Sequence, residues 1–366
     1  MKKSYLDITL SIAAGVLILS VGAGVWLLPS DDFSEEENRA LATLSSPTLA
    51  SITDGSFSGD ISNYLCDRLP FRIEAIRLRA LTELLLLKGE CNSVLFCRDG
   101  YLLDRGEYED LTKAENKLNE LSDLRSALSE AGIPVTVAYI PRGIDVMEEK
   151  LPSLYEGSQK DILTVITTDS ADTDLTTPLK KAADAGEYVW FKTDHHWTSH
   201  GAYIAYSELS SALGYTPYQK DLFTQETVSE DFLGSIYSRA GCVASSPDTV
   251  ELYRYEGDGE YLLSAEGELL QRGLYFPEHL EKKDKYSVFL GGNYAYLSIK
   301  KEADGSRPRL LIIKDSYANA LVPFLALHFD IEMIDPRFYS GYEEIYDKVK
   351  NTDQALILQG IDTIAT

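Results

Sequence analysis

The chain has 366 residues and a formal net charge of −24, from 34 lysines and arginines against 58 aspartates and glutamates. Such acidity argues against a nucleic-acid-binding protein, and against tight retention of a bare polyanion unless cations or a local basic patch assist. Beyond an N-terminal targeting segment, the length allows one large α/β domain, or one domain with a smaller lobe.

The N-terminus carries a candidate membrane span. Lys2 and Lys3 precede a run from Ile8 to Leu28 without a charged residue. As a helix rising about 1.5 Å per residue, this run crosses a bilayer core of roughly 30 Å. The lysines before the span place the main domain outside the cytoplasm by the positive-inside rule. We predict a single-pass signal anchor in the cell membrane over residues 1–30, with cleavage near Gly22–Gly24 as the alternative.

Two kinds of segment are expected between the anchor and the main domain. Residues 31 to about 65 are polar and rich in Ser and Thr, which indicates a linker. Residues 67–88 carry Leu, Arg and Glu at helical spacing, which predicts one long helix. We therefore assign residues 31–90 to a linker with an N-terminal helical segment, and residues 91–366 to the main domain.

Four cysteines in an exported chain allow disulfides. Cys91 and Cys97 flank a short apolar stretch and are suited to a local pair, which would leave Cys66 and Cys242. Other connectivities and free thiols stay open, because sequence alone does not decide the pairing.

Helices and strands alternate along the main domain, which predicts an α/β fold with a parallel sheet flanked by helices on both faces. Residues 214–285 are rich in Tyr, Gly and acidic residues, and are expected to form an insertion over the site. The other expected elements are a hairpin turning at Asp99-Gly100, a helix over 112–131, a strand over 135–140, a helix capped by Thr198 and ending at Leu213, and buried strands over 310–313, 331–334 and 355–358.

The segment Asp194-His195-His196-Trp197 carries an acid and a base two positions apart. In extended backbone, residues i and i+2 point to the same side, so Asp194 can orient His196 while His195 faces away. A serine hydroxyl needs such a base to take its proton before it can act as a nucleophile. This pair therefore indicates a serine hydrolase or acyltransferase.

Ser316 is a serine that fits the pair. It follows the apolar run Leu310–Ile313 and precedes an apolar helix, so it sits at the carboxyl end of a predicted strand, where α/β sheets place their sites. The helix N-terminus there would favour developing negative charge. The alternative is that Ser316 only caps this helix.

Two blocks of sequence resemble the DHHW family. The first is Lys192-Thr193-Asp194-His195-His196-Trp197-Thr198, and the second is Lys314-Asp315-Ser316-Tyr317-Ala318-Asn319. That family is similar to alginate O-acetylation proteins with an SGNH-hydrolase-like domain. The resemblance implies a triad of nucleophile Ser316, base His196 and orienting Asp194, on an SGNH-like fold with reordered, or permuted, catalytic blocks. It also implies a membrane-bound O-acyltransferase as partner.

Further residues are candidates for the oxyanion hole and for substrate binding. The N–H of Tyr317 follows the nucleophile, and Gly292 and Asn293 form a tight turn that could supply other donors. Arg142 and Arg337 each follow a predicted strand and could bind substrate, with surface ion pairs as the alternative. Trp197 is suited either to stacking on a sugar or to packing behind the base.

We predict no metal and no cofactor. His200 lies four residues after His196, a spacing that helical zinc sites use. However, Thr198 is the expected helix start, so His196 would lie outside that helix. Manganese phosphoesterases with a DHH motif need further upstream motifs, and no histidine precedes position 195.

These features lead to two hypotheses. The first is an extracytoplasmic, serine-dependent O-acetyltransferase or acetylesterase that acts on a cell-envelope or exported polysaccharide. The second is a non-catalytic glycan-binding or scaffold protein of a polysaccharide export assembly. The 23 tyrosines and the Tyr-rich region 214–300 suit carbohydrate contacts under either hypothesis, because aromatic faces pack on sugars.

Overall fold

The structure is a computed structural model that describes residues 2–27, 32–34, 36, 39–106, 111–153, 155, 167, 170–241, 245–302, 307–338 and 352–365. The chain divides into two compact units. The first comprises Met1–Lys88 with Gly241–Val243, and the second comprises Gly89–Ala240 with Ala244–Thr366.

The first unit begins with helix α1 (Lys2–Leu27), which holds the predicted membrane span. Of the helices that the structure describes, this one alone is long and apolar enough to cross a membrane, over Asp7–Val25, with 19 residues and a mean hydropathy of 2.2. Its length and composition agree with a signal anchor and equally with a signal sequence.

The remainder of the first unit differs from the prediction. The expected linker over residues 31–65 contains two helices, α2 (Leu49–Thr53) and most of α3 (Ser56–Asp67). The prediction of a single helix over residues 67–88 is also wrong. Helix α3 ends at Asp67, and a separate helix, α4 (Arg72–Leu85), follows it. Pro70 lies between them, where a residue without an N–H does not continue a helix. Two short strands, β1 (Phe33–Ser34) and β2 (Arg39–Ala40), complete the described elements.

The second unit is built on a seven-stranded sheet in the order β10-β9-β11-β13-β12-β14-β6. The last four strands are parallel to one another, whereas β11, β9 and β10 are joined antiparallel. The bounds are β6 (Val135–Ile140), β9 (Tyr261–Ala265), β10 (Glu268–Arg272), β11 (Tyr296–Lys301), β12 (Arg309–Lys314), β13 (Asp330–Ile334) and β14 (Gln354–Gly360).

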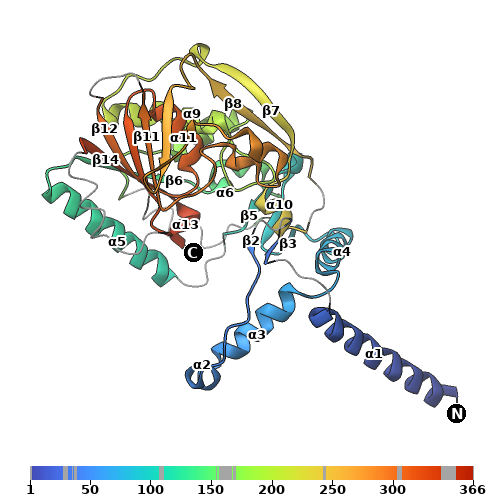
Figure 1. Ribbon diagram of the computed structural model, residues 1–366. Helices are drawn as coiled ribbons and strands as arrows, with labels where there is room; N and C mark the ends of the chain where they lie inside the picture. The colour runs from blue at the N-terminus through green and yellow to red at the C-terminus, as the bar shows by residue number, and fades with distance from the viewer. Residues whose placement is uncertain are drawn as a thin grey trace. The chain divides into compact units, whose positions relative to one another are not determined.

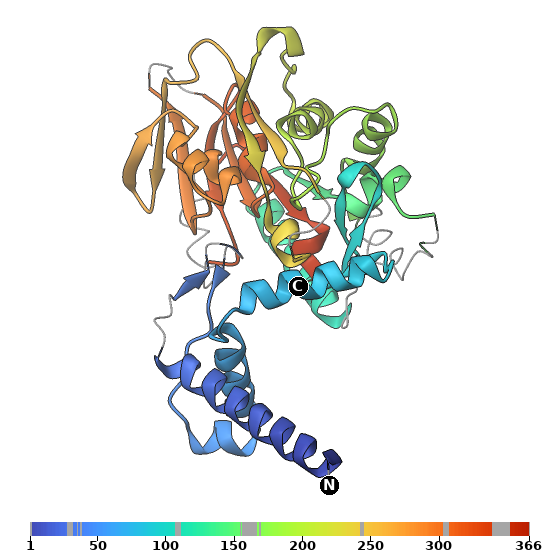
Figure 2. The same ribbon diagram turned by 90° about the vertical axis from the view of Figure 1, so that its right-hand side faces the viewer.

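The predicted α/β class is confirmed, and the predicted parallel sheet is found in β13-β12-β14-β6, whereas the other three strands of the sheet are antiparallel. Figure 2 shows the orange antiparallel strands beside the red strands that belong to the parallel part of the sheet. Within the insertion expected over residues 214–285, β9 and β10 are strands of this sheet and not a separate cap. The tyrosine-rich composition of that segment obscured the strand pattern.

Helices cover both faces of the sheet, so the unit has three layers (Figure 1). Alternate residues of β12 face opposite ways, as a strand requires. Leu310 and Ile312 pack with helices α8 (Thr176–Asp184), α9 (Ser199–Leu213) and α11 (Ala318–Leu325). Leu311 and Ile313 pack with α5 (Leu111–Glu130) and α13 (Ile361–Ala365). Because both faces are covered, β12 is apolar along almost its whole length.

Smaller elements surround these layers. The predicted hairpin is confirmed: Asp99 and Gly100 have φ angles of 57° and 78° between β4 and β5. The small elements are β3 (Glu90–Cys91), β4 (Val94–Phe96), β5 (Leu102–Asp104), α6 (Gly143–Val146), β7 (Thr224–Phe232), α10 (Ser235–Arg239), β8 (Asp248–Arg254), and five short 3₁₀ turns at Arg98–Gly100, Glu148–Lys150, Lys220–Leu222, Pro277–Glu281 and Lys285–Val288.

The predicted local disulfide does not form in the structure. Cys91 and Cys97 are not joined by a disulfide, and Cys97 and Cys66 are free thiols. Cys242 lies outside the described residues. Burial raises the pKa of the Cys97 thiol to about 12, so this thiol stays protonated and unreactive at neutral pH.

Candidate active site

Ser316 lies where the parallel strands end. Strand β12 stops at Lys314, and α11 begins at Ala318, so Ser316 stands in the turn between them. Asp315 ties this turn to the neighbouring strand: its carboxylate accepts the Tyr317 N–H at 3.0 Å and the Gly360 N–H at 2.6 Å. The serine does not cap α11, whose N-cap is Tyr317 without a side-chain bond. Its hydroxyl is therefore left for another partner.

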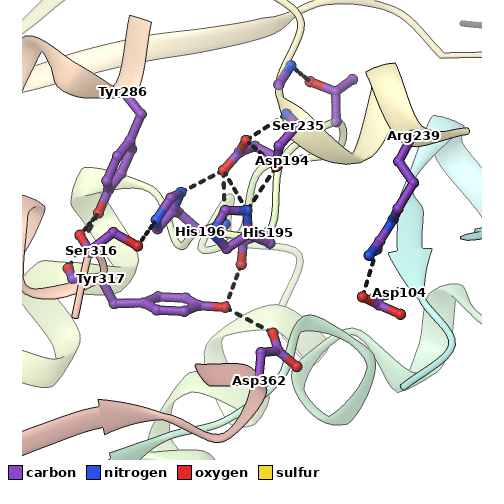
Figure 3. A network of polar contacts seen from close by, with 12 residues as sticks. Asp104, Asp194, His195, His196, Ser235, Arg239, Tyr286, Ser316, Tyr317 and Asp362 are labelled. Atoms are coloured by element: carbon purple, nitrogen blue, oxygen red, sulfur yellow. Dashed lines mark hydrogen bonds and ion pairs between the residues drawn. The ribbon is translucent and has the colours of Figure 1, made fainter. Parts of the chain in front are cut away.

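That partner is His196, which is 120 residues away in the sequence. The Ser316 Oγ lies 2.8 Å from His196 Nε2, and His196 Nδ1 lies 2.6 Å from Asp194 Oδ1 (Figure 3). An ionised carboxylate only accepts hydrogen bonds, so Nδ1 carries the proton and donates to Asp194. Nε2 is then free to accept the serine O–H. The structure thus joins Ser316, His196 and Asp194 in one chain of hydrogen bonds.

The backbone around Asp194 is a closed loop, not an extended strand. Trp190 and Trp197 pair across it as an antiparallel bridge, and the Phe191 N–H donates to the His196 carbonyl at 3.2 Å. The prediction that His195 faces away from its neighbours is consequently wrong. The two imidazole rings lie 3.8 Å apart between centroids, and His195 Nδ1 lies 3.6 Å from Asp194 Oδ1.

Asp194 is buried and surrounded by donors. The His196 N–H donates to Oδ1 at 3.0 Å, and Ser235 donates to Oδ2 through its N–H at 2.8 Å and its hydroxyl at 3.0 Å. Burial alone would raise the pKa of Asp194, but the two imidazoles and these donors hold it well below its usual value. Asp194 is therefore a carboxylate across the physiological pH range.

Ser235 connects the second histidine to the same carboxylate. His195 Nδ1 lies 2.8 Å from Ser235 Oγ, and that hydroxyl donates onward to Asp194. His195 is partly exposed, with 36% of its side chain accessible. Partial burial and repulsion from His196 lower its pKa. We assign His195 Nδ1 as the protonated nitrogen, because Ser235 already uses its own proton on Asp194.

Aromatic rings hold the base in place. Tyr286 stacks on His196 with ring centroids 3.7 Å apart and planes 7° from parallel. Its hydroxyl donates to the carbonyls of Ser316 at 3.3 Å and Tyr317 at 3.2 Å. The Tyr317 hydroxyl donates to the His195 carbonyl at 2.7 Å. Two tyrosines thus connect the serine turn to the histidine loop.

The candidate oxyanion-hole residues differ in whether their donor groups are already engaged. The Tyr317 N–H already donates to Asp315, so in this structure it is not directed at a reacting oxygen. Asn293 is exposed, and its Oδ1 accepts from Lys314 Nζ at 2.9 Å and from Asn319 Nδ2 at 3.2 Å. The Gly292 carbonyl accepts from Asn319 Nδ2 at 3.1 Å. Gly292 and Asn293 therefore remain the candidates with N–H groups to offer.

The substrate-binding candidates are mostly engaged elsewhere. Arg142 is buried and forms a two-bond ion pair with Asp145, at 2.8 and 3.1 Å. Trp197 is fully buried and donates its indole N–H to the Tyr317 carbonyl, so sugar stacking is wrong for this residue and packing is right. Arg337 is 37% exposed but pairs with Asp335. Arg337 alone stays a candidate for substrate binding.

The tyrosines of the 214–300 region do not form a carbohydrate platform as a group. Tyr253, Tyr261, Tyr275 and Tyr286 are buried in the core. Tyr218 is 42% exposed. The composition therefore reflects an aromatic core more than a sugar-binding surface.

Among the described residues, Asp194, His195 and His196 form a group that could hold a metal ion. Their ligand atoms lie within 4.8 Å of one another. However, the Asp194 oxygens already accept four donors, and a cation would have to displace them. His200 lies apart from this group and contacts Glu187. The donor set fits proton relay better than metal binding.

Several site residues were missed by sequence reasoning. Lys314 and Asn319 lie inside the second sequence block, so their position beside Ser316 was a usable signal. Ser235, Asp248 and Tyr286 had no local signal, because each reaches the site from a distant segment. Asp248, for instance, accepts the N–H groups of Lys192 and Thr193, both at 2.8 Å, and so fixes the start of the histidine loop.

Comparison with known proteins confirms the resemblance to the DHHW family. The family model described as DHHW protein matches residues 178–334, which contain both sequence blocks. Two curated relatives are named probable alginate O-acetylase AlgJ. The one from Pseudomonas fluorescens is 23% identical over 207 residues, 54% of this chain and 50% of that protein. The one from Pseudomonas syringae pv. tomato is 22% identical over 223 residues, 58% of this chain and 54% of that protein. The matched region thus spans about half the length of these relatives.

Solved structures share the fold. A DHHW family protein from Eubacterium siraeum superimposes with a TM-score of 0.63 at 23% identity, covering 76% of this chain and 93% of that one. Bacillus cereus PatB1 superimposes with a TM-score of 0.61 at 20% identity, covering 75% of this chain and 97% of that one. At such low identity the likeness establishes a common fold and leaves the activity to be argued from the site.

Proposed function

We propose that this protein is a serine-dependent O-acetyltransferase or acetylesterase that acts on a cell-envelope or exported polysaccharide. The observation that carries the proposal is the continuous hydrogen-bond chain from Ser316 through His196 to Asp194. The relatives named alginate O-acetylases support acetyl transfer to a polysaccharide as the reaction class. The Asp-His block precedes the serine block, in keeping with a permuted SGNH-like arrangement.

The first half-reaction transfers the acetyl group to the enzyme. Ser316 Oγ attacks the acetyl carbonyl carbon and forms a new C–O bond, while its proton moves to His196 Nε2. Asp194 stabilises the resulting imidazolium and keeps Nδ1 as the donor nitrogen. When the tetrahedral intermediate collapses, the bond to the leaving group breaks and the leaving oxygen takes the proton from His196. The product is acetyl-Ser316.

The second half-reaction releases the acetyl group. A sugar hydroxyl, or water, gives its proton to His196 and attacks the acetyl-Ser316 carbonyl. Collapse returns the proton to Ser316 and yields an O-acetylated sugar or acetate. Transfer and hydrolysis use the same residues, and they differ in whether a sugar or water occupies the acceptor position.

We also propose that α1 anchors the protein in the cell membrane with the main domain outside the cytoplasm. The uncharged helix and the lysines before it support this orientation. A membrane-bound O-acyltransferase would then supply acetyl groups from across the membrane, and Ser316 would receive them. No soluble cofactor is required for this chemistry.

Turnover of p-nitrophenyl acetate tests the enzymatic proposal. We expect the wild-type protein to release nitrophenolate, and Ser316→Ala and His196→Ala to lose this activity. Ser211→Ala, at an exposed serine of α9, is the matched control and should keep it. Equal turnover by the wild type and Ser316→Ala would overturn the proposal. Wild-type inactivity toward this ester and toward acetylated glycans would favour the scaffold hypothesis.

A further inference from the structure

A buried lysine beside the nucleophile has no part in the proton relay. Lys314 is the last residue of β12, and only 2% of it is exposed. Its Nζ lies 2.9 Å from Asn293 Oδ1, 2.9 Å from Asn319 Oδ1 and 3.7 Å from Asp335 Oδ2. Burying an ammonium is costly unless each proton finds a partner. Here the three partners surround one ammonium group.

Asn319 completes this arrangement on the same turn as the nucleophile. Its N–H donates to the Ser316 carbonyl at 3.1 Å, which places it in the first turn after the serine. Its side-chain amide donates to the Gly292 carbonyl at 3.1 Å and to Asn293 Oδ1 at 3.2 Å. The Gly292–Asn293 turn is thus bonded directly to the segment that carries Ser316.

These contacts orient the Asn293 amide. Its Oδ1 receives two donors, Lys314 Nζ and Asn319 Nδ2, so its amino group points away from the lysine. Asn293 is exposed, so that amino group is accessible to a ligand. A cation bonded to an amide oxygen draws electron density from the amide, which makes its N–H groups stronger donors.

The turn itself is held in an unusual backbone conformation. Gly292 has a φ of +109°, which L side chains rarely adopt, and the preceding Gly291 has a φ of +77°. Glycine adopts such φ values without strain, so two glycines permit this turn. The Gly291 N–H donates to the Ser287 carbonyl at 3.1 Å, and the Asn319 side chain donates to the Gly292 carbonyl. Because the Tyr317 N–H is engaged by Asp315, an oxyanion at Ser316 has to find donors elsewhere.

We infer that Lys314 and Asn319 are positioning residues that hold and polarise the Gly292–Asn293 turn as the oxyanion-binding element of the site. The inference rests on the proposed acetyl-transfer function. Neither side chain touches the substrate. Their effect reaches the reaction through Asn293 and Gly292, and it grows as negative charge develops on the acyl oxygen.

Steady-state kinetics of the full-length protein with p-nitrophenyl acetate test this inference. Lys314→Met removes the ammonium and keeps the length of the side chain. Asn319→Asp keeps an acceptor for Lys314 and removes the donor to Gly292. Lys300→Met, at an exposed lysine of β11, is the matched control. We expect kcat to fall on the order of 10²-fold in the first two variants, with KM within about threefold, and no change in the control.

An inhibitor separates positioning from general damage. A trifluoromethyl ketone forms a tetrahedral oxyanion on the serine, so its Ki should rise by about the same factor as kcat falls. A structural defect alone would weaken the binding of the substrate and the binding of the inhibitor equally. Should Lys314→Met fail to fold, Asn319→Asp carries the same test.

The possible outcomes distinguish this inference from the proposed function. If wild-type turnover is lost in Ser316→Ala but retained in both Lys314→Met and Asn319→Asp, the positioning role of Lys314 and Asn319 is refuted, and the proposed enzymatic function still stands. A fall in kcat with an unchanged Ki also refutes this positioning role. Turnover that does not depend on Ser316 refutes the proposed function, and with it the positioning role of Lys314 and Asn319. Parallel changes in kcat and Ki support the inference.

Discussion

Gly234 packs directly against Asp194. A Cβ built on Gly234 would lie 2.3 Å from Asp194 Cβ and 2.4 Å from its Oδ2, distances that real Cβ atoms do not show. The absence of a side chain at position 234 thus allows the carboxylate to reach both Ser235 and His196.

The first prediction is that Gly234→Ala lowers kcat by about tenfold or more. The added methyl group displaces Asp194, and His196 then loses the donor geometry that orients it. Overpacking costs about 1–3 kcal/mol of stability, so the protein should still fold. The measurement is ester turnover beside a thermal melt. Gly259→Ala is the control, because a Cβ there meets nothing within 4 Å; equal turnover in the two variants would contradict the prediction.

The second prediction concerns acid stability through Ser235. The pKa of Asp194 is held low in the folded protein, so its contribution to stability is present above the usual carboxyl pKa and is lost as the pH falls toward the folded value. Ser235→Ala removes one donor to Asp194 and raises that folded pKa. Acid unfolding, followed by circular dichroism, should therefore begin at a higher pH than in the wild type. An unchanged acid midpoint would refute this, and Ser211→Ala serves as the control.

The third prediction separates the two histidines. His196→Gln should lower kcat by at least about 10³-fold, because within the described part of the chain His196 is the base that hydrogen-bonds Ser316 Oγ. His195→Gln should lower it by less than about tenfold, since its Nδ1 hydrogen-bonds Ser235 and lies 3.6 Å from Asp194, whereas the base bonded to Ser316 Oγ is His196. Ester turnover at one pH is sufficient. The reverse order of effects would show that the wrong histidine was assigned as the base.

The fourth prediction tests ring stacking on the base. Tyr286→Leu removes the ring that stacks on His196 and the hydroxyl that bonds two carbonyls. Tyr275→Leu removes a comparably buried ring and a hydroxyl bonded to the Tyr253 carbonyl, away from the histidines. Both variants should lose a few kcal/mol of stability, but only Tyr286→Leu should also lower kcat, by about tenfold. A similar kcat for the two folded variants would argue that stacking has no role in catalysis.

The fifth prediction follows from the buried ammonium of Lys314. Burial lowers its pKa to about 8, although Asp335 and Asp315 oppose this and Arg337 assists it. Between that value and the unfolded value near 10.4, the unfolded chain binds more protons, so stability rises with pH. The gain from this group is up to about 3 kcal/mol.

Other groups titrate in the same range, and Cys97 acts in the opposite direction because its pKa is raised in the folded state. The measurement is therefore the difference in free energy of unfolding between the wild type and Lys314→Met at pH 7.5 and at pH 10. The free energy of unfolding of the wild type should increase relative to that of the variant as the pH rises. A constant difference would mean that Lys314 titrates normally.

The strand-to-helix position of Ser316 could be predicted from the sequence because it depends on local pattern. An apolar β-branched run followed by a small polar turn and an apolar helix specifies β12, the turn and α11. The same holds for the Thr198 cap, whose hydroxyl accepts the Gly201 N–H at 3.2 Å. The Asp-x-His spacing likewise identified the pair that the structure joins to Ser316.

Predictions from the local sequence pattern were wrong where a residue's contact partner comes from a distant segment of the chain. His195 was expected to face away, but the Trp190–Trp197 bridge closes its loop and brings both rings to Asp194. The burial of Trp197 depends on that closure and on packing against Tyr317. Neither contact can be derived from alternation along a strand.

Short-range periodicity and residue chemistry were enough to identify the candidate nucleophile, its base and the class of the fold. The groups that surround these residues depend on tertiary packing: Ser235 bonds Asp194, Tyr286 stacks on His196, and Lys314 bonds Asn293. The physical reason is that each such contact depends on how the chain closes loops between distant segments. The energy that selects one closure over another is spread across the whole packed core.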